Sequence, residues 1–239
     1  MKNKQTFTAA LLFTALFFLA VTFLSSCGDD SVSSSSNNNN NNGTTSSVSL
    51  SVKTDEGALD NPASLVIDEA KALITEVEAE QEPSGTSQHI RIAPFVIYFN
   101  MNGNIITVIT GEIPRGPYNK IKLKIHKPED TEPIPDPEFR EGSSGNQRYS
   151  FIIKGRYNGI SFVYKSRKSA SLIIGLVAST NLQVGSANFT MLVNPLTWFN
   201  NGTLDPSNSG NENEIDDNLK NSFRRAFRDD DKNGLPDDN

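Results

Sequence analysis

The sequence predicts a mainly β fold, an antiparallel and immunoglobulin-like β-sandwich followed by a C-terminal α-helix. Three observations predict it. From Val48 onward, apolar and polar residues alternate in short segments, as they do along a strand with one buried face. Two Asn-Gly pairs separate apolar runs, which is the strongest short-range signal for a hairpin. Seven or more strands follow one another without alternating helical segments, which is typical of a sandwich.

Each strand is predicted from its own alternation. Val48, Leu50 and Val52 share one face of the first strand. Further strands are expected at residues 95–99 and 105–109 around Asn102-Gly103, at 118–125, at 151–153 and 162–164 around Asn158-Gly159, at 171–177 and at 189–193. In the strand at 118–125, lysines alternate with apolar residues, and such a basic stripe usually faces solvent.

One segment fits two patterns. Val66, Ala70 and Leu73 recur at helical spacing, whereas Leu73 and Val77 also fit the alternation of a strand. Periodicity does not decide between helix and strand over so few residues. Because a sheet needs partners for its edges, we interpret residues 71–80 as a strand.

The N-terminus has the features of an export signal. Two lysines precede an apolar stretch at residues 9–24, which is shorter than the roughly 18 to 20 residues of a membrane-spanning helix. The stretch leads into Leu24-Ser25-Ser26-Cys27, which resembles the bacterial lipobox, whose cysteine is acylated and becomes the first residue of the mature protein. The alternative is a chance cysteine after an uncleaved signal anchor. We expect residues 1–26 to be a signal peptide and Cys27 to carry the lipid anchor.

The residues after Cys27 bear on location. Residue 28 is Gly and not the Asp that resembles an inner-membrane retention signal in enteric bacteria, which favours the outer membrane. Asp29 and Asp30 resemble the surface-export signal of some bacterial lipoproteins, although acidic residues are also common in a polar tether. The prediction is an outer-membrane lipoprotein, on the periplasmic face or the cell surface.

Composition divides the remaining chain. Residues 27–47 are mostly Ser, Asn, Thr and Gly, with six consecutive Asn, and they have too few apolar side chains to fold. We expect them to form a flexible tether. Residues 48–199 hold the predicted strands, and residues 200–239 hold a linker, an amphipathic helix and an acidic loop.

Composition also excludes several functions. A net charge of -6 leaves no excess of cations to neutralise phosphates, so nucleic-acid binding is not expected. One Cys excludes an internal disulfide, a Cys-rich zinc site and a Cys-x-x-Cys redox pair. The sequence holds no nucleophile elbow, zinc-binding helix, phosphate loop or dinucleotide fingerprint. We interpret His89 and His126 as separate surface or core residues, and Trp198 as a core residue in preference to a sugar-stacking platform.

A family resemblance concerns the middle of the chain. The segment Ile113-Pro114-Arg115-Gly116-Pro117-Tyr118 leads into the strand at 118–125. It resembles the Ile-Pro-x-Gly-x-Tyr approach to a strand in a family of uncharacterised bacterial lipoproteins, which have a lipobox and a β-sandwich. The likeness covers residues 48–199, and the family has no established activity to carry over. In physical terms, Pro114 and Gly116 make a turn and Tyr118 begins a strand.

The sharpest motif lies near the C-terminus. Residues 229–237 match the first nine positions of an EF-hand-type calcium loop, Asp-x-Asp-x-Asn-Gly-x-x-Asp. Oxygen ligands at alternate positions can converge on one cation. The predicted ligands are the side chains of Asp229, Asp231, Asn233 and Asp237 and the carbonyl of Leu235.

The surroundings of this loop bear on its role. Apolar residues recur at helical spacing in residues 214–228, so a helix is expected to enter the loop. The sequence ends at Asn239, before the bidentate Glu of a complete loop, and the loop resembles the truncated calcium loops of dockerins and thrombospondin type 3 repeats. We expect a structural Ca²⁺ of weak to moderate affinity. The alternative is a solvated acidic tail.

Together these features predict a lipid-anchored cell-envelope protein whose β domain is not an enzyme and binds a glycan or an envelope protein, or serves a structural role. The alternatives are a carbohydrate-active enzyme, a glycan-binding accessory of an uptake system, and an adhesive or assembly subunit. Exposed rows of aromatic residues would favour glycan binding. Paired carboxylates in a cleft would favour catalysis, and an unpaired edge strand would favour assembly.

Overall fold

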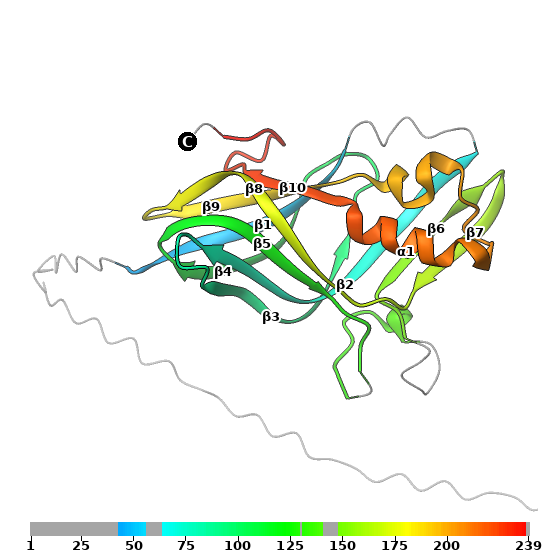
Figure 1. Ribbon diagram of the computed structural model, residues 1–239, viewed down its shortest axis with the longest axis horizontal. Coiled ribbons are helices and arrows are strands. Elements are labelled where there is room, and N and C mark those ends of the chain that lie inside the picture. Colours follow the sequence, from blue (N-terminus) through cyan, green and yellow to red (C-terminus); the bar gives the residue numbers. More distant parts are fainter. Residues whose placement is uncertain (1–42, 56–63, 130, 141–147, 238–239) are drawn as a thin grey trace, which may run out of the picture. The chain divides into compact units, whose positions relative to one another are not determined.

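The computed structural model describes residues 43–55, 64–129, 131–140 and 148–237. Within these residues the fold is mainly β, with one C-terminal α-helix (Figure 1). The strands are β1 (Thr45–Thr54), β2 (Leu65–Gln81), β3 (Ser87–Tyr98), β4 (Ile106–Pro114), β5 (Gly116–Ile125), β6 (Phe151–Tyr157), β7 (Ile160–Ser166), β8 (Ala170–Leu182), β9 (Ser186–Val193) and β10 (Phe223–Arg228). The helices are α1 (Glu212–Asn221) and the short 3-10 helices η2 (Pro137–Phe139), η4 (Pro195–Gly202) and η5 (Ser209–Asn211).

The alternating segments form strands as predicted. Val48, Leu50 and Val52 of β1 are buried, and the apolar residues of β5 also face the core. The segment with two interpretations is the long strand β2, which confirms the strand and extends it at its start to Leu65. Tyr118 of β5 is buried, and its hydroxyl donates a hydrogen bond to the Pro114 carbonyl over 2.7 Å. Tyr118 of the family-like motif therefore has a packing role.

The described strands form one sheet. Its order is β4-β1-β9-β10-β8-β5-β2-β6-β7, and β3 also pairs with β2. The sheet curls, and two of its pairings, β1 with β9 and β10 with β8, are parallel. The sequence predicts two packed antiparallel sheets of the immunoglobulin kind, whereas the described strands join in one curled, mixed sheet. The difference arises because β10 lies between β9 and β8 and connects what would otherwise be two sheets.

The two Asn-Gly turns have different outcomes. Asn158-Gly159 connects the antiparallel strands β6 and β7, so the predicted hairpin is confirmed. Asn102-Gly103 does not make a hairpin, because β3 pairs with β2 and β4 pairs with β1. These two strands nevertheless approach closely, since a Cβ atom on Gly111 of β4 would lie 2.3 Å from the Ile90 carbonyl oxygen of β3.

The C-terminal segment corrects a second prediction. The helix expected over residues 214–228 ends at Asn221, and residues 223–228 form strand β10 instead. Phe223 and Ala226 are buried there, opposite Val193 and Met191 of β9. Apolar residues at helical spacing also fit this strand, and pairing with β9 overrides the local periodicity.

The core lies on the inner face of the curled sheet, and aromatic residues join its parts. Phe99 and Phe151 pack against the fully buried Trp198, with ring centres of Phe99 and Trp198 5.5 Å apart, and Phe223 packs against both phenylalanines. The prediction that Trp198 packs in the core is confirmed. Strand β1 begins at Thr45, so the last residues assigned to the tether already belong to the sheet. Cys27 lies outside the described residues.

Candidate functional site

The predicted calcium loop directly follows β10. Asp229 is fully buried, and its amide donates a hydrogen bond to the Asn188 carbonyl over 2.9 Å. At the far end of the loop, the Asp237 amide donates to the Arg228 carbonyl over 2.9 Å, so the chain turns back on itself. The prediction that a helix enters this loop is wrong, because a strand leads into it.

The Asp229 carboxylate organises the loop. Its Oδ1 accepts hydrogen bonds from the amides of Asn233 at 2.9 Å and Gly234 at 3.3 Å, and its Oδ2 accepts one from Thr190 Oγ1 at 2.7 Å. All of these donors are uncharged. Neutral dipoles therefore surround a buried carboxyl group, which is an environment that a bound cation would complement.

A buried polar network ties this loop to the sheet. Asn188 Oδ1 of β9 accepts hydrogen bonds from Ser49 at 2.8 Å and Ser51 at 2.7 Å, both on β1. Its Nδ2 donates to Thr190 Oγ1 at 3.0 Å and to the Asp229 carbonyl at 2.9 Å. Because an unpaired buried polar group is costly, this network fixes the position of Asp229 against two strands.

The three carboxylates among the five predicted calcium ligands lie close together. Asp229, Asp231 and Asp237 each offer a carboxylate oxygen, and these oxygens all lie within 4.8 Å of one another. Asn233 lies beside them, where its Oδ1 accepts from the Leu235 amide at 2.7 Å and its Nδ2 donates to Asp231 at 2.8 Å. Carboxylate oxygens are the ligands that Ca²⁺ prefers, so the donor set fits this ion.

A second cluster of charges lies on the outer face of the sheet. Three glutamates alternate along β2 and three lysines along β5, and the register pairs Glu76 with Lys124, Glu78 with Lys122 and Glu80 with Lys120. Glu80 lies 2.5 Å from Lys120 Nζ and 2.6 Å from Lys122 Nζ. Hydrogen bonds from these two lysines hold the pKa of the Glu80 carboxyl below its usual value. The lysine stripe therefore pairs with β2, in addition to facing solvent.

His89 and His126 contact different carboxylate groups. His89 Nδ1 lies 3.1 Å from Glu76 and 3.3 Å from Glu78, and these three groups lie close enough to share a metal ion. His126 Nε2 lies 3.5 Å from Glu132. The described contacts of His89 and His126 thus involve different carboxylates.

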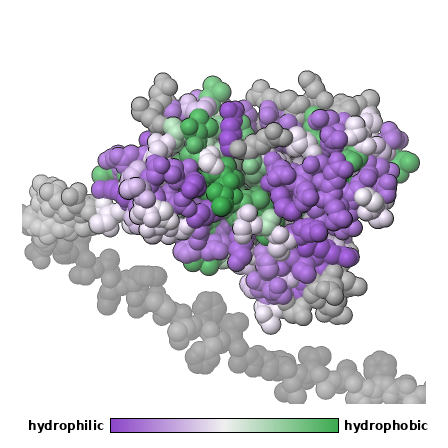
Figure 2. Space-filling model, viewed as in Figure 1, coloured by the Kyte–Doolittle hydropathy of each residue, from purple (hydrophilic) through white to green (hydrophobic). Residues whose placement is uncertain are grey.

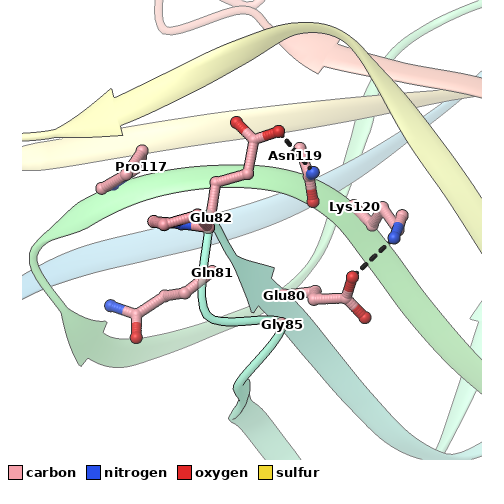
Figure 3. Close-up of a pocket in the computed structure, with 8 residues that line it drawn as sticks. Glu80, Gln81, Glu82, Gly85, Pro117, Asn119 and Lys120 are labelled. Atoms are coloured by element: carbon pink, nitrogen blue, oxygen red, sulfur yellow. Dashed lines mark hydrogen bonds and ion pairs between the residues drawn. The ribbon is translucent and has the colours of Figure 1, made fainter.

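A hollow of about 540 Å³ opens at one end of these charged rows. Its lining comes from the end of β2 and the following turn, with Glu80, Gln81, Glu82, Pro83 and Gly85, and from β5, with Pro117, Asn119 and Lys120 (Figure 3). In this close-up, Glu80 is paired with Lys120 and Glu82 with Asn119.

Hydrogen bonds hold the lining of the hollow in place. Ser179 Oγ donates to Glu82 at 2.7 Å and Asn119 Nδ2 donates to Glu82 at 2.8 Å. These bonds, the one from Ser179 first, hold the pKa of the Glu82 carboxyl below its usual value. Asn119 Oδ1 is buried and has no hydrogen-bond partner among the described residues.

Strand β8 turns apolar side chains outward beside the lysines. Ile173 is 67% exposed and Val177 is 54% exposed. Figure 2 shows a hydrophobic patch in the middle of the displayed face, where Figure 1 draws β8, with hydrophilic residues around it. Exposed apolar patches with a polar rim are typical of binding surfaces.

A pattern in the sequence indicates the charged face of β2 and β5, although it was not part of the prediction. The glutamates at 76, 78 and 80 and the lysines at 120, 122 and 124 both have a spacing of two, which places each set on one side of its strand. The register between β2 and β5 decides that the two sets lie opposite each other, and it depends on contacts across forty or more residues of sequence. The hollow therefore could not be located from the sequence.

No protein-family model, no curated protein and no solved structure matches this chain. In the part of the chain that the structure describes, no helix is long and apolar enough to cross a membrane.

Proposed function

We propose that this chain is a lipid-anchored protein of the bacterial outer membrane whose β domain binds a ligand without catalysing a reaction. The lipobox that ends at Cys27 and the Ser/Asn-rich segment after it support the anchor and the tether. The resemblance to the uncharacterised lipoprotein family belongs to the same proposal. The binding role rests on one observation, a hollow of about 540 Å³ lined by hydrogen-bonding side chains.

The lining favours a glycan as the ligand. Asn119 and Gln81 carry amide groups, which both donate and accept hydrogen bonds, as sugar hydroxyls do. Pro83 and Pro117 contribute apolar surface to the lining of the hollow. Because the carboxylates of the lining already have hydrogen-bond partners, the hollow suits a neutral sugar better than a strongly charged ligand.

The two glutamates of the hollow also bear on the enzyme alternative. Hydrolysis of a glycoside needs one carboxyl group that stays protonated near neutral pH, which requires a raised pKa. The pKa values of Glu80 and Glu82 are both lowered, so both groups are ionised at that pH. This environment supports binding over hydrolysis.

Calorimetry with neutral oligosaccharides, selected on a glycan array, tests the binding role. We expect Asn119→Ala to weaken binding about tenfold, as the loss of one good hydrogen bond does. Ser161→Ala, an exposed polar substitution on β7, is the control and should bind like the wild type. Absence of binding to every neutral glycan, or equal binding by Asn119→Ala, would refute the glycan site.

We propose in addition that the C-terminal loop binds Ca²⁺ in a structural role. The convergence of Asp229, Asp231 and Asp237 supports this, and the network through Asn188 would transmit the order of the loop to β9 and β1. Calcium should raise Tm, magnesium at equal concentration should not, and Asp231→Ala should abolish the rise. Calorimetry that detects no calcium uptake up to about ten millimolar would leave only a solvated acidic loop.

Assembly through an edge strand is the second candidate function. Among the described strands β7 pairs with β6 alone, and its Ile160 and Val163 are 72% and 57% exposed. Such an edge can accept a strand from a partner. If it does, the wild type should self-associate in sedimentation experiments and Val163→Lys should be monomeric. A wild type that stays monomeric at high concentration would exclude self-assembly by this edge.

A further inference from the structure

Strand β2 carries a buried lysine on the side that the β5–β6 connection covers. Lys71 is 4% exposed. Its Nζ lies 5.7 Å from the ring centre of Phe139, in the short helix η2, and 5.9 Å from that of Tyr98. A small apolar cluster lies at the same place, separate from the main core, and consists of Leu73, Phe139, Tyr149 and Ile152. Water is therefore largely excluded from the lysine.

Two carboxylates from η2 and its N-cap reach this lysine. Lys71 Nζ lies 2.5 Å from Asp136 Oδ2, and it also contacts Glu138 Oε2. Asp136 is itself buried, at 9% exposure. Pro135 and Pro137 flank Asp136 and fix their own φ angles, which lowers the entropic cost of holding the carboxyl against the amine.

Both oxygens of the Asp136 carboxyl accept hydrogen bonds. The Glu138 amide donates to Oδ1 at 2.9 Å, and the Tyr98 hydroxyl donates to Oδ2 at 3.1 Å. Donors placed in this way stabilise the negative charge that develops on a carboxyl oxygen when a nucleophile adds to the carbon. The cluster thus combines an amine, a polarised carboxyl and a second carboxylate that can carry a proton.

We propose that Lys71 and Asp136 condense into an intramolecular amide bond. A proton first passes from the Lys71 ammonium to the Asp136 carboxylate, which leaves a neutral amine and a neutral carboxyl. The nitrogen lone pair then forms a bond to Cγ of Asp136. Glu138 takes a proton from the nitrogen and delivers it to the hydroxyl that departs, and the C–O bond breaks as water leaves. Ammonium and carboxylate become amide and water, so the step balances without a cofactor or oxidant.

The protonation of Lys71 in the resting cluster limits the rate of condensation. Burial alone would lower the pKa of Lys71, but its hydrogen bonds with Asp136 and Glu138 outweigh burial and raise that pKa above the usual value. The cluster therefore rests as an ion pair, and the neutral amine forms only by proton transfer inside it. We expect condensation to be slow and to proceed after folding, because only the folded chain brings these groups together.

The amide bond would link β2 covalently to the β5–β6 connection. The two residues are 65 positions apart in the sequence, so the new bond would close a long loop. Lys154 provides a matched comparison, since it also contacts Glu138, at 2.8 Å, but its side chain is 31% exposed. Its carboxylate partners among the described residues are Glu138 and Glu69, and neither is buried.

Intact-mass spectrometry of the purified full chain tests the proposal. The wild type should be lighter by one water molecule than its sequence requires, and digestion should give one branched peptide that contains Lys71 and Asp136. Lys71→Arg and Asp136→Ala should have their full mass. Glu138→Gln keeps the reacting pair but lacks the proton carrier, so it should lose water much more slowly. Lys154→Arg should lose water like the wild type.

Circular dichroism on the same samples separates chemistry from misfolding. A wild type that is folded and still at full mass after prolonged incubation would overturn the proposal, and the cluster would then be a buried ion pair. Loss of water that persists in Lys71→Arg would place the modification elsewhere and would equally overturn it. Loss at the wild-type rate in Glu138→Gln would overturn the mechanism through Glu138.

Discussion

Two buried charges in this fold are stabilised in opposite ways. Lys71 lies between the carboxylates of Asp136 and Glu138, so its cluster contains its own counter-charges. Asp229 is equally buried, but the hydrogen-bond donors that the structure describes around its carboxylate are uncharged. The first cluster pairs its cation with carboxylates of the same chain, whereas the Asp229 carboxylate has uncharged donors and two neighbouring carboxylates, an arrangement that an added cation would complement.

This difference predicts different responses to the environment. The Lys71 cluster should depend on its own residues and on pH, and it should be indifferent to metal ions. The Asp229 loop should respond to calcium, because the other carboxylates near it, Asp231 and Asp237, repel it until a cation is bound. Substitutions at the two places can therefore distinguish a self-sufficient cluster from one that needs a ligand.

The largest effect is expected at the lysine. Compared with Lys71→Arg, which keeps a cation beside Asp136 but does not condense, Lys71→Ala leaves the buried Asp136 carboxylate without its cation, and breaking a buried pair in this way typically costs about 3 to 5 kcal/mol of unfolding free energy. Urea unfolding followed by circular dichroism measures it. The double variant Lys71→Met with Asp136→Leu should recover most of the loss, because an apolar pair of similar volume avoids the buried charge. A loss below about 1 kcal/mol in the single variant would contradict the account of this cluster.

The next effect is expected at Asp229. Asp229→Ala leaves the Thr190 hydroxyl and the Gly234 amide without their acceptor, which should cost about 2 to 3 kcal/mol in the absence of calcium. Asp231→Ala is the control, since Asp231 is exposed and should change calcium-free stability by about 0.5 kcal/mol or less. Chemical denaturation in a chelating buffer gives both values. Equal losses in the two variants would mean that Asp229 has no special structural role.

The Asp229 loop can be predicted from the sequence, whereas the Lys71 cluster cannot. The Asp229 loop is contiguous, so the spacing of its oxygen ligands can be read from nine residues, and three of the predicted ligands do meet. The Lys71 cluster joins residues 65 positions apart, and Asp136 and Glu138 had no recognisable ligand spacing in their Pro-rich segment. Local chemistry is legible in a sequence, whereas a contact between β2 and a distant connection depends on the whole sheet.

The same distinction holds for the fold. Alternation identifies β1, β5 and β9 because each has one buried face, and Asn158-Gly159 gives its hairpin because the two strands are adjacent in the chain. The pairing of β10 with β9 cannot be read locally, since its apolar spacing also fits a helix. Asn102-Gly103 fails for a related reason, as both flanking strands find more distant partners.

A smaller effect is expected where the loop backbone turns. Gly234 has a φ of +84°, and a Cβ atom added there would lie 2.7 Å from Lys53 Nζ. Gly234→Ala should cost about 1 to 2 kcal/mol, because L-residues are strained at this φ, and displacement of Lys53 should add to the loss. Gly85→Ala is the matched control, with a φ of +68° and open space around the added atom. Thermal unfolding should show the larger fall in Tm for Gly234→Ala, and the reverse order would contradict the close packing of this loop.

The smallest and most specific effect concerns acid. Burial alone would raise the pKa of the Asp136 carboxyl, but hydrogen bonds from Lys71, the Glu138 amide and Tyr98 outweigh burial and hold that pKa below its usual value. As pH falls, the unfolded chain therefore binds this proton first. The stability that the carboxylate contributes is complete above its unfolded pKa of about 3.9 and is lost as pH falls through the lower folded value.

Formation of the amide would change this dependence. An amide does not titrate, so the condensed wild type should lack the part of the acid sensitivity that comes from Asp136. Lys71→Arg keeps a cation beside Asp136 but does not condense, and it should retain that part. The Tm of the two proteins, measured from about pH 6 to about pH 2, should therefore diverge further below about pH 4, with Lys71→Arg falling more steeply. Curves that stay parallel over this range would mean that Asp136 titrates alike in both proteins, as it would in an uncondensed ion pair.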